Sequence, residues 1–346
     1  MPAVTESPGG WRPWARAVVV GTSLLLGVAA CGGPNGGPGN DGPPTSSAGG
    51  PGGEFSVLSY NVAGLDQGLT GGNDPAARMP LISPLLNEYD IVLTQEDYDW
   101  FQGDYDGLDL VQNHERLRAD ATHEHRTGRH PGPQVAGLDP ASRDLNVGDG
   151  LGIMSRFPFQ SRYPLDDEFR VAWRGCYGSV GTAEGSGAEC VSMKGFAMVT
   201  IQLDNTTPVD LYTFQGEGGV TLADQQLQAE DFEQLTEYID QRSAGRAVIV
   251  GGDTGLNIEP GAAGAFGDED SQIWATFLER NGLTDACDTL SCGDAASPHK
   301  IASRGDDVVT LTPVSHSFVR DTFTGPDGEL SDQPPLAVGF SWRTGG

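Results

Sequence analysis

Oxygen-bearing side chains stand directly where several apolar runs of this chain begin or end. In chain order they are Asn61, Gln95, Glu96, Asp253 and, ahead of the last run, Asp332. Carboxylate and amide oxygens are the ligands that a hard cation such as magnesium prefers. Catalytic groups collect on loops at one edge of a rigid sheet. The pattern therefore predicts a divalent-metal site, although any one of these residues taken singly is typical of a turn or a cap.

The runs that position these residues alternate with helical patterns, which is typical of a layered α/β fold. We expect helices over 75–88, 222–241 and 271–281; in the second, Phe232, Leu235 and Ile239 recur at helical spacing. The expected strands are 55–60, 90–94, 151–154, 196–201, 209–213, 246–250, 308–311 and 335–342. Many short strands predict two packed, mostly antiparallel sheets with helices outside, in the α/β (α+β) class.

The N-terminal segment has the pattern of a targeting signal. Arg12 and Arg16 precede an apolar run over 17–30 that is shorter than the roughly 20 residues needed to span a bilayer. The run ends in Val28-Ala29-Ala30-Cys31, which resembles a bacterial lipobox. We expect residues 1–31 to form a lipoprotein signal in which Cys31 is lipidated, which would anchor the chain to the extracellular face of the cell membrane. The alternative is an ordinary signal peptide with an incidental cysteine.

Residues 32–53 are almost entirely Gly, Pro, Ser, Asn, Asp and Thr. Such a segment buries too little apolar surface to offset the entropy of ordering it, so it is expected to be a disordered, flexible tether. Residues 54–346, about 290 residues, are then expected to form one domain.

Four cysteines follow Cys31, and an even number in an exported chain favours two disulfides. Of the three possible connectivities we expect the local one, which pairs Cys176 with Cys190 and Cys287 with Cys292. A zinc site is the alternative, but neither a Cys-x-x-Cys motif nor a pair of histidines accompanies these cysteines.

The formal net charge of −28 argues against nucleic acid as a partner, since such a binder needs a basic stripe to displace counterions. The one concentration of basic residues, over 114–130, also carries Glu115, Asp120 and Glu124. We expect it to be a solvated loop. The sequence leaves the oligomeric state open.

Several motifs together resemble the endonuclease/exonuclease/phosphatase superfamily, which has the deoxyribonuclease I-like fold. In chain order they are Ser59-Tyr60-Asn61-Val62, the segments 90–96 and 150–158, Lys194-Gly195-Phe196, Gly252-Asp253 and Ser331-Asp332. The resemblance covers about 55–342. The segment 190–195, with a cysteine before the Lys-Gly strand, is most similar to the bacterial neutral sphingomyelinase branch.

The resemblance implies a four-layer sandwich and divalent-metal-dependent hydrolysis of a phosphodiester. Asn61 and Glu96 would hold the cation, expected to be Mg²⁺. Asp253 would line the phosphate pocket and Asp332 would support the metal site. Asp306, or Asp307 if the alignment slips by one residue, would orient a general-base histidine. The implied substrate is a phospholipid head group or another extracellular phosphoester.

The chain departs from the pattern of this family at three of the expected catalytic positions. Phe214 and Gln333 stand where histidines are expected, and Gly255 stands where an asparagine is expected. Glutamine cannot carry a proton at neutral pH. His299 and His316 are expected at the surface. Two functions remain open, namely a phosphodiesterase of altered mechanism and a catalytically silent module that binds phosphate or a partner.

Overall fold

The computed structural model describes residues 50–65, 74–102, 109–129, 148–161, 168–175, 194–219, 222–256, 267–293 and 296–345. These residues fall within one compact unit, Ser47–Gly346. Cys31, the greater part of the tether, Cys176 and Cys190 lie outside the described residues, so the predictions made for them stay predictions.

Two six-stranded mixed sheets form the centre of this unit. The first has the order β13-β16-β1-β2-β6-β5 and the second the order β11-β12-β10-β9-β8-β7. The strands of the first sheet are β1 (Gly52–Asn61), β2 (Ile91–Gln95), β5 (His125–Arg126), β6 (Gly152–Ser155), β13 (Val309–Phe318) and β16 (Leu336–Thr344). Those of the second are β7 (Glu168–Ala172), β8 (Gly195–Gln202), β9 (Pro208–Gln215), β10 (Val248–Asp253), β11 (Thr284–Asp285) and β12 (His299–Arg304). Two short hairpins, β3 (Trp100–Gln102) with β4 (Asp109–Val111) and β14 (Thr324–Gly325) with β15 (Gly328–Glu329), complete the described strands.

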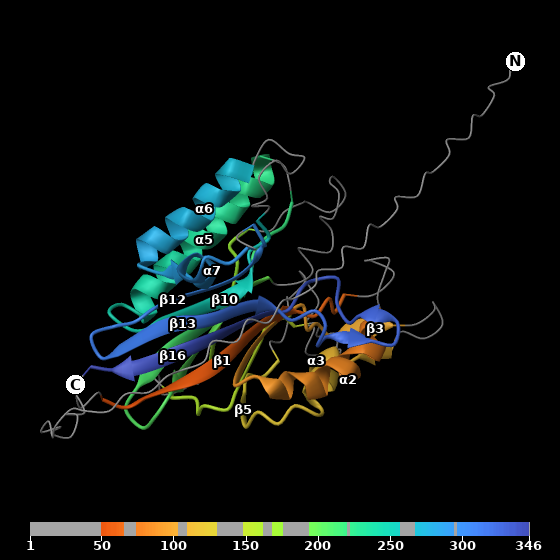
Figure 1. The fold of residues 1–346 in the computed structure, drawn as a ribbon. Coiled ribbons are helices and arrows are strands. Elements are labelled where there is room, and N and C mark those ends of the chain that lie inside the picture. Colours follow the sequence, from red (N-terminus) through yellow and green to blue (C-terminus); the bar gives the residue numbers. More distant parts are fainter. Residues whose placement is uncertain are drawn as a thin grey trace, which may run out of the picture. The chain divides into compact units, whose positions relative to one another are not determined.

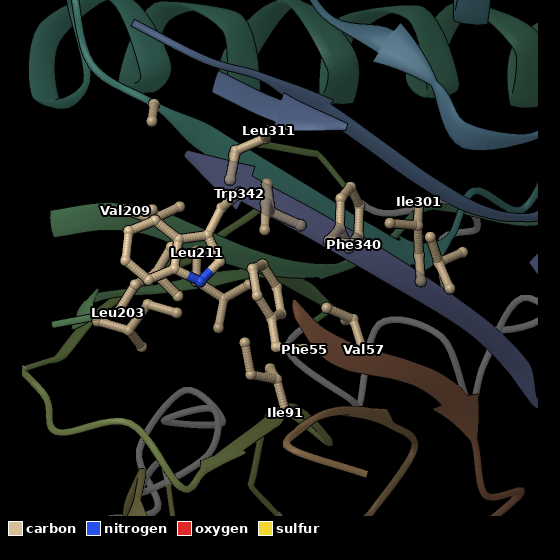
Figure 2. Packing of buried hydrophobic residues seen from close by; sticks show 14 of the residues in the cluster. Phe55, Val57, Ile91, Leu203, Val209, Leu211, Ile301, Leu311, Phe340 and Trp342 are labelled. Atoms are coloured by element: carbon tan, nitrogen blue, oxygen red, sulfur yellow. The ribbon is translucent and has the colours of Figure 1, made fainter. Parts of the chain in front are cut away.

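The two-residue period of the strands divides the apolar side chains between two cores. In β1, Phe55 and Val57 enter the core between the sheets, whereas Leu58 and Tyr60 enter the core under the helices. Figure 2 shows the inter-sheet core, where Phe55, Val57 and Ile91 of the first sheet lie with Val209, Leu211 and Ile301 of the second. Because both faces of the central strands are apolar, each sheet is buried on both sides.

Helices cover the outer face of each sheet (Figure 1). On the second sheet, α5 (Leu222–Arg242) and α6 (Gly267–Asn281) pack through aromatic residues that include Phe232, Trp274 and Phe277. On the first sheet, α2 (Pro75–Leu85) and α3 (Asn113–Arg118) pack through Met79, Ile82 and Leu117. The remaining described helices are the 3₁₀ turn η1 (Leu86–Glu88) and α7 (Ala286–Leu290). The predicted sandwich of two sheets between helices is confirmed.

The strand β12 is the most consequential element that the sequence pattern missed. Of its six residues only Ile301 and Ala302 are apolar, so no apolar run marks it. It becomes a strand because it pairs with β10 along its whole length and with β11 on its other side.

The predicted disulfide between Cys287 and Cys292 is present in the structure. His316 lies beside it, with Nε2 4.0 Å from the Cys292 Sγ atom. The three side chains form a group of potential metal ligands, but both sulfurs are joined to each other. Cys287 and Cys292 therefore form a disulfide and not the alternative zinc site.

The basic segment is not the solvated loop that was expected. His114, Arg118 and His123 are 3 %, 6 % and 1 % exposed. The Arg118 Nη1 atom lies 2.9 Å from the buried Asp97 carboxylate, and His114 Nδ1 lies 3.4 Å from it. A buried polar network thus occupies the space directly behind the end of β2.

Within the described residues, no helix combines the length and the apolar character needed to cross a membrane.

Candidate active site

Parallel strand pairs in both sheets bring polar residues to one common edge. β1 runs parallel to β2 with Asn61 opposite Gln95, and β10 runs parallel to β9 with Asp253 opposite Gln215. The carboxyl ends of parallel strands meet at the same edge of a sheet, where ligand sites form in open α/β folds. The two sheets pack so that these two edges adjoin, since Asn61 contacts Asp253 directly.

Hydrogen bonds join the residues at this edge into one cluster. The Asn61 amide nitrogen donates to Glu96 Oε1 at 2.8 Å and to Asp253 Oδ2 at 3.0 Å. The Gln215 amide nitrogen donates to the same Glu96 oxygen at 2.7 Å. The structure therefore brings Asn61, Glu96 and Asp253 together from the ends of three strands in two sheets.

The backbone of Glu96 adopts a left-handed conformation, with φ of 59°. Such conformations in non-glycine residues cost about 1–3 kcal/mol and persist where the surroundings enforce them. Here the Gly64 amide donates to the Glu96 carbonyl at 2.9 Å, and a Cβ at Gly64 would lie 2.0 Å from that oxygen. The turn after β2 therefore requires glycine at 64 and points the Glu96 side chain into the cluster.

The carboxylates of the cluster have opposite pKa shifts. Burial raises the pKa of Glu96, and the neighbouring charges of Asp253 and Asp332 add to this, while the Asn61 hydrogen bond and Lys194 oppose it. For Asp253, burial also acts to raise the pKa, but His299, the Gly255 amide, Asn61 and Lys194 outweigh it and the net shift is downward. Of these two carboxylates, Glu96 is thus the one whose negative charge the protein compensates less.

The loop before β16 lies against the same edge. The Ser331 hydroxyl donates to the Asn61 backbone carbonyl at 2.8 Å, and the backbone N–H of Gln333 donates to the Ser331 hydroxyl at 3.1 Å. Asp332 between them is exposed. Asp332 and Gln333 therefore belong to the rim of the cluster.

His299 is the site residue that the sequence pattern missed. It was expected at the surface, but it is 1 % exposed and lies opposite Asp253 in the β10–β12 pairing. Its Nε2 atom is 2.8 Å from Gln333 Oε1. Recognising β12 as a strand would have revealed it, since paired residues present their side chains on the same face.

Asp306 does not reach this site, which corrects the expectation for it and for Asp307. Its carboxylate accepts from the backbone amides of Ala247, Val308 and Val309 and so caps the turn between β12 and β13. β12 runs from His299 at the site to Arg304, about 17 Å along a strand, before the turn begins. The side chain that contacts Gln333 is His299, not Asp306.

The expected histidine position on β9 also requires correction. Phe214 is fully buried and packs edge-on against Phe232 of α5, with ring centroids 5.7 Å apart. The next residue, Gln215, faces the cluster and is held there by Tyr98, whose hydroxyl donates to Gln215 Oε1 at 3.1 Å. The side chain of β9 that faces this edge is therefore Gln215, not Phe214.

Gly255 cannot be exchanged for the expected asparagine without strain. Its φ is 65°, and a Cβ there would lie 2.2 Å from the Glu217 carbonyl oxygen. Its amide donates to Asp253 Oδ1 at 3.0 Å, so the turn itself positions that carboxylate.

We expect Phe214→His to destabilise the protein by about 3 kcal/mol, because it removes a buried ring and encloses polar nitrogens in an apolar core. Gln215→His should cost less than about 1.5 kcal/mol, since that side chain already has polar neighbours. Denaturant unfolding of the two variants measures both effects. Equal stabilities would contradict the orientation of β9.

The oxygen atoms of the cluster suit a hard divalent cation, for which the Glu96 carboxylate would be the ligand. The carboxylates of Asp253 and Asp332 lie close enough to Glu96 to raise its pKa, and a cation would offset this negative charge. Asn61 now turns its nitrogen toward the carboxylates, while its Oδ1 accepts from the Ala63 amide at 3.0 Å. To act as a ligand through oxygen, its amide would have to turn over. When bound, a cation here would neutralise charge on a phosphoryl group.

The fold defined by these sheets is shared with proteins of the endonuclease/exonuclease/phosphatase superfamily. A protein of that description from Beutenbergia cavernae aligns with a TM-score of 0.53 at 15 % identity, over 85 % of this chain and 72 % of that one. Sphingomyelinase C from Streptomyces griseocarneus gives 0.53 at 17 %, over 83 % and 99 %. The chain therefore has the deoxyribonuclease I-like fold, as its motifs indicated.

The chain is also similar in sequence to a sphingomyelinase. The chain is 29 % identical over 313 residues to the sphingomyelinase of Mycobacterium tuberculosis, and the match covers 84 % of this chain and 53 % of that protein. The chain thus matches about half the length of that relative. A beta toxin variant from Staphylococcus aureus with the same fold holds bound magnesium ions (TM-score 0.52, 13 % identity, 82 % and 99 % coverage). No protein-family model matches the chain.

Proposed function

We propose that this chain is a lipid-anchored, Mg²⁺-dependent phosphodiesterase that acts on a phospholipid head group outside the cell. The convergence of Asn61, Glu96 and Asp253 at one edge carries this proposal, because it forms an acidic, oxygen-rich cluster of the kind that holds a cation and a phosphoryl group. Similarity to sphingomyelinases, named for a phospholipid, supports the substrate class, and the magnesium-bound toxin supports the cation.

The location rests on the N-terminal sequence alone. Cys31 follows an apolar run and three small or aliphatic residues, as in a lipobox. Mass spectrometry of the mature N-terminus tests the anchor: an acylated Cys31 at the first position supports it, and an unmodified Cys31 within a longer chain contradicts it.

The hydrolysis is tested with purified protein and sphingomyelin or another choline phospholipid in detergent micelles. Phosphocholine should appear with Mg²⁺ and should cease on addition of a chelator. Because the site lacks a solvent-facing imidazole at 215 and at 333, we expect a rate about 10²–10⁴-fold below that of an enzyme with a positioned base. Absence of release from a broad panel of phosphodiesters would contradict the proposal.

A second candidate, a catalytically silent phosphate-binding module, is favoured by one observation. Both side chains that face the cluster from β9 and from the last loop, Gln215 and Gln333, are amides. The double change Gln215→His with Gln333→His separates the two candidates. Release of phosphocholine by the double variant alone supports the silent module, whereas release by the unchanged protein excludes it.

A further inference from the structure

Three side-chain amides at the strand-end edge share one arrangement, in which a protein donor occupies the carbonyl oxygen. An amide oxygen only accepts and an amide nitrogen only donates, so a donor on the oxygen fixes the direction of the NH₂ group. The three pairs are Ala63 N to Asn61 Oδ1 at 3.0 Å, Tyr98 Oη to Gln215 Oε1 at 3.1 Å, and His299 Nε2 to Gln333 Oε1 at 2.8 Å.

Two of the three NH₂ groups are used within the protein. Those of Asn61 and Gln215 donate to the carboxylates of Glu96 and Asp253. The NH₂ group of Gln333 has no acceptor among the described residues, and the side chain is only half-buried. One oriented donor at the rim of the cluster therefore remains available to a ligand.

His299 is placed to orient this amide rather than to exchange a proton with water. Because Gln333 Oε1 can only accept, the imidazole donates through Nε2. The other ring nitrogen, Nδ1, is enclosed and has no hydrogen-bond partner among the described residues. With one nitrogen engaged and the other shut off from solvent, an attacking water cannot contact the ring in this geometry.

We infer that the amide nitrogen of Gln333 binds a phosphoryl oxygen of the ligand, and that His299 is the positioning residue that fixes it. This rests on the proposed function, in which a phosphoester occupies the cluster. Preorganised amide donors stabilise charge on such oxygens without a proton transfer. Gln333 is then a binding residue. With glutamine in place of the expected histidine, position 333 donates a hydrogen bond to the ligand instead of transferring a proton.

The test uses the full chain, Mg²⁺ and phosphocholine, with both affinities measured by titration calorimetry. Gln333→Met removes the donor at similar size and should weaken phosphocholine binding about 10-fold, with Mg²⁺ affinity unchanged. His299→Leu should weaken it about 3–10-fold, whereas His299→Gln, which can still donate to Gln333 Oε1, should retain most of it. Thermal unfolding confirms that each variant is folded.

The outcomes separate the inference from the proposed function. Parent-like phosphocholine affinity in Gln333→Met, while Mg²⁺ still binds, overturns the inference and leaves the function standing. Equal losses in His299→Leu and His299→Gln overturn the positioning role of His299. If the unchanged chain binds neither Mg²⁺ nor phosphocholine, the proposed function and the inference both fall.

Discussion

Replacing Glu96 with glutamine is expected to abolish divalent-cation binding and, in metal-free protein, to make the fold more stable. The introduced amide can still accept the hydrogen bonds of Asn61 and Gln215 through its oxygen, so the local structure is retained. The change removes a buried negative charge that burial and two neighbouring carboxylates disfavour. Gains of about 0.5–2 kcal/mol are usual when a strained functional group is neutralised.

The stability gain should depend on pH in one direction. The pKa of Glu96 is raised in the folded protein, so the stability it contributes is fully present below its unfolded pKa, about 4.3, and is lost as pH rises through the folded pKa. The gain from Glu96→Gln should therefore be largest near neutral pH and should disappear below about pH 4. Urea unfolding across this range, with the exposed Glu88→Gln as a control, measures it. A Glu96→Gln protein that is less stable at pH 7 would contradict the electrostatics described for the site.

The change Asp97→Asn is expected to destabilise the protein by about 3–5 kcal/mol, because it leaves Arg118 buried without its counter-ion. Arg118 is 6 % exposed and its Nη1 atom lies 2.9 Å from Asp97. Burial acts to raise the pKa of Asp97, but Arg118 and His114 outweigh it and hold that pKa well below its usual range. Asp97 follows Glu96 directly, so Mg²⁺ affinity should fall as well.

The matched control removes the same kind of charge at the surface. Glu329 lies 3.2 Å from Arg320, and both side chains are 48 % exposed. Glu329→Gln should cost at most about 1 kcal/mol. The melting temperature should drop by roughly 10 °C for Asp97→Asn and by a few degrees at most for the control. Similar changes in the two variants would show that the network behind β2 does not support the fold.

The residues at the ends of apolar strands were the part of the site that sequence could predict. Asn61, Glu96 and Asp253 follow runs that are buried on both faces, and such runs are recognisable without a structure. Their convergence follows from parallel pairing in each sheet. The same reasoning predicted the packed sheets and the helices α5 and α6.

Strands without an apolar run were out of reach, and the errors at the site follow from that. β12 reads His299-Lys300-Ile301-Ala302-Ser303-Arg304, and its pairing depends on β10 and β11 rather than on its own composition. Because its sequence does not mark β12 as a strand, Asp306 is expected beside position 333, where the structure has His299. On β9 the error was one of side-chain direction, because a shift by one residue exchanges the core face for the site face. Phe214 therefore lies in the core under α5, and Gln215 is the residue that contacts Glu96.

For the basic segment, composition alone predicted the wrong environment of the side chains. A cluster of arginines and histidines is typical of a solvated surface, yet Arg118 and His114 are buried because Asp97 and Asp99 are brought to them by the turn after β2. Partners of this kind lie far apart in the chain, so the local sequence carries no sign of them.

The most direct test of the cation site is a crystal structure of the protein grown with Mn²⁺, in which anomalous scattering locates the ion. We expect one ion bound to the Glu96 carboxylate at about 2.0–2.3 Å, between Asn61 and Asp253, and no ion there in Glu96→Gln. An ion-free cluster at saturating Mn²⁺, or an ion bound only elsewhere on the chain, would contradict it.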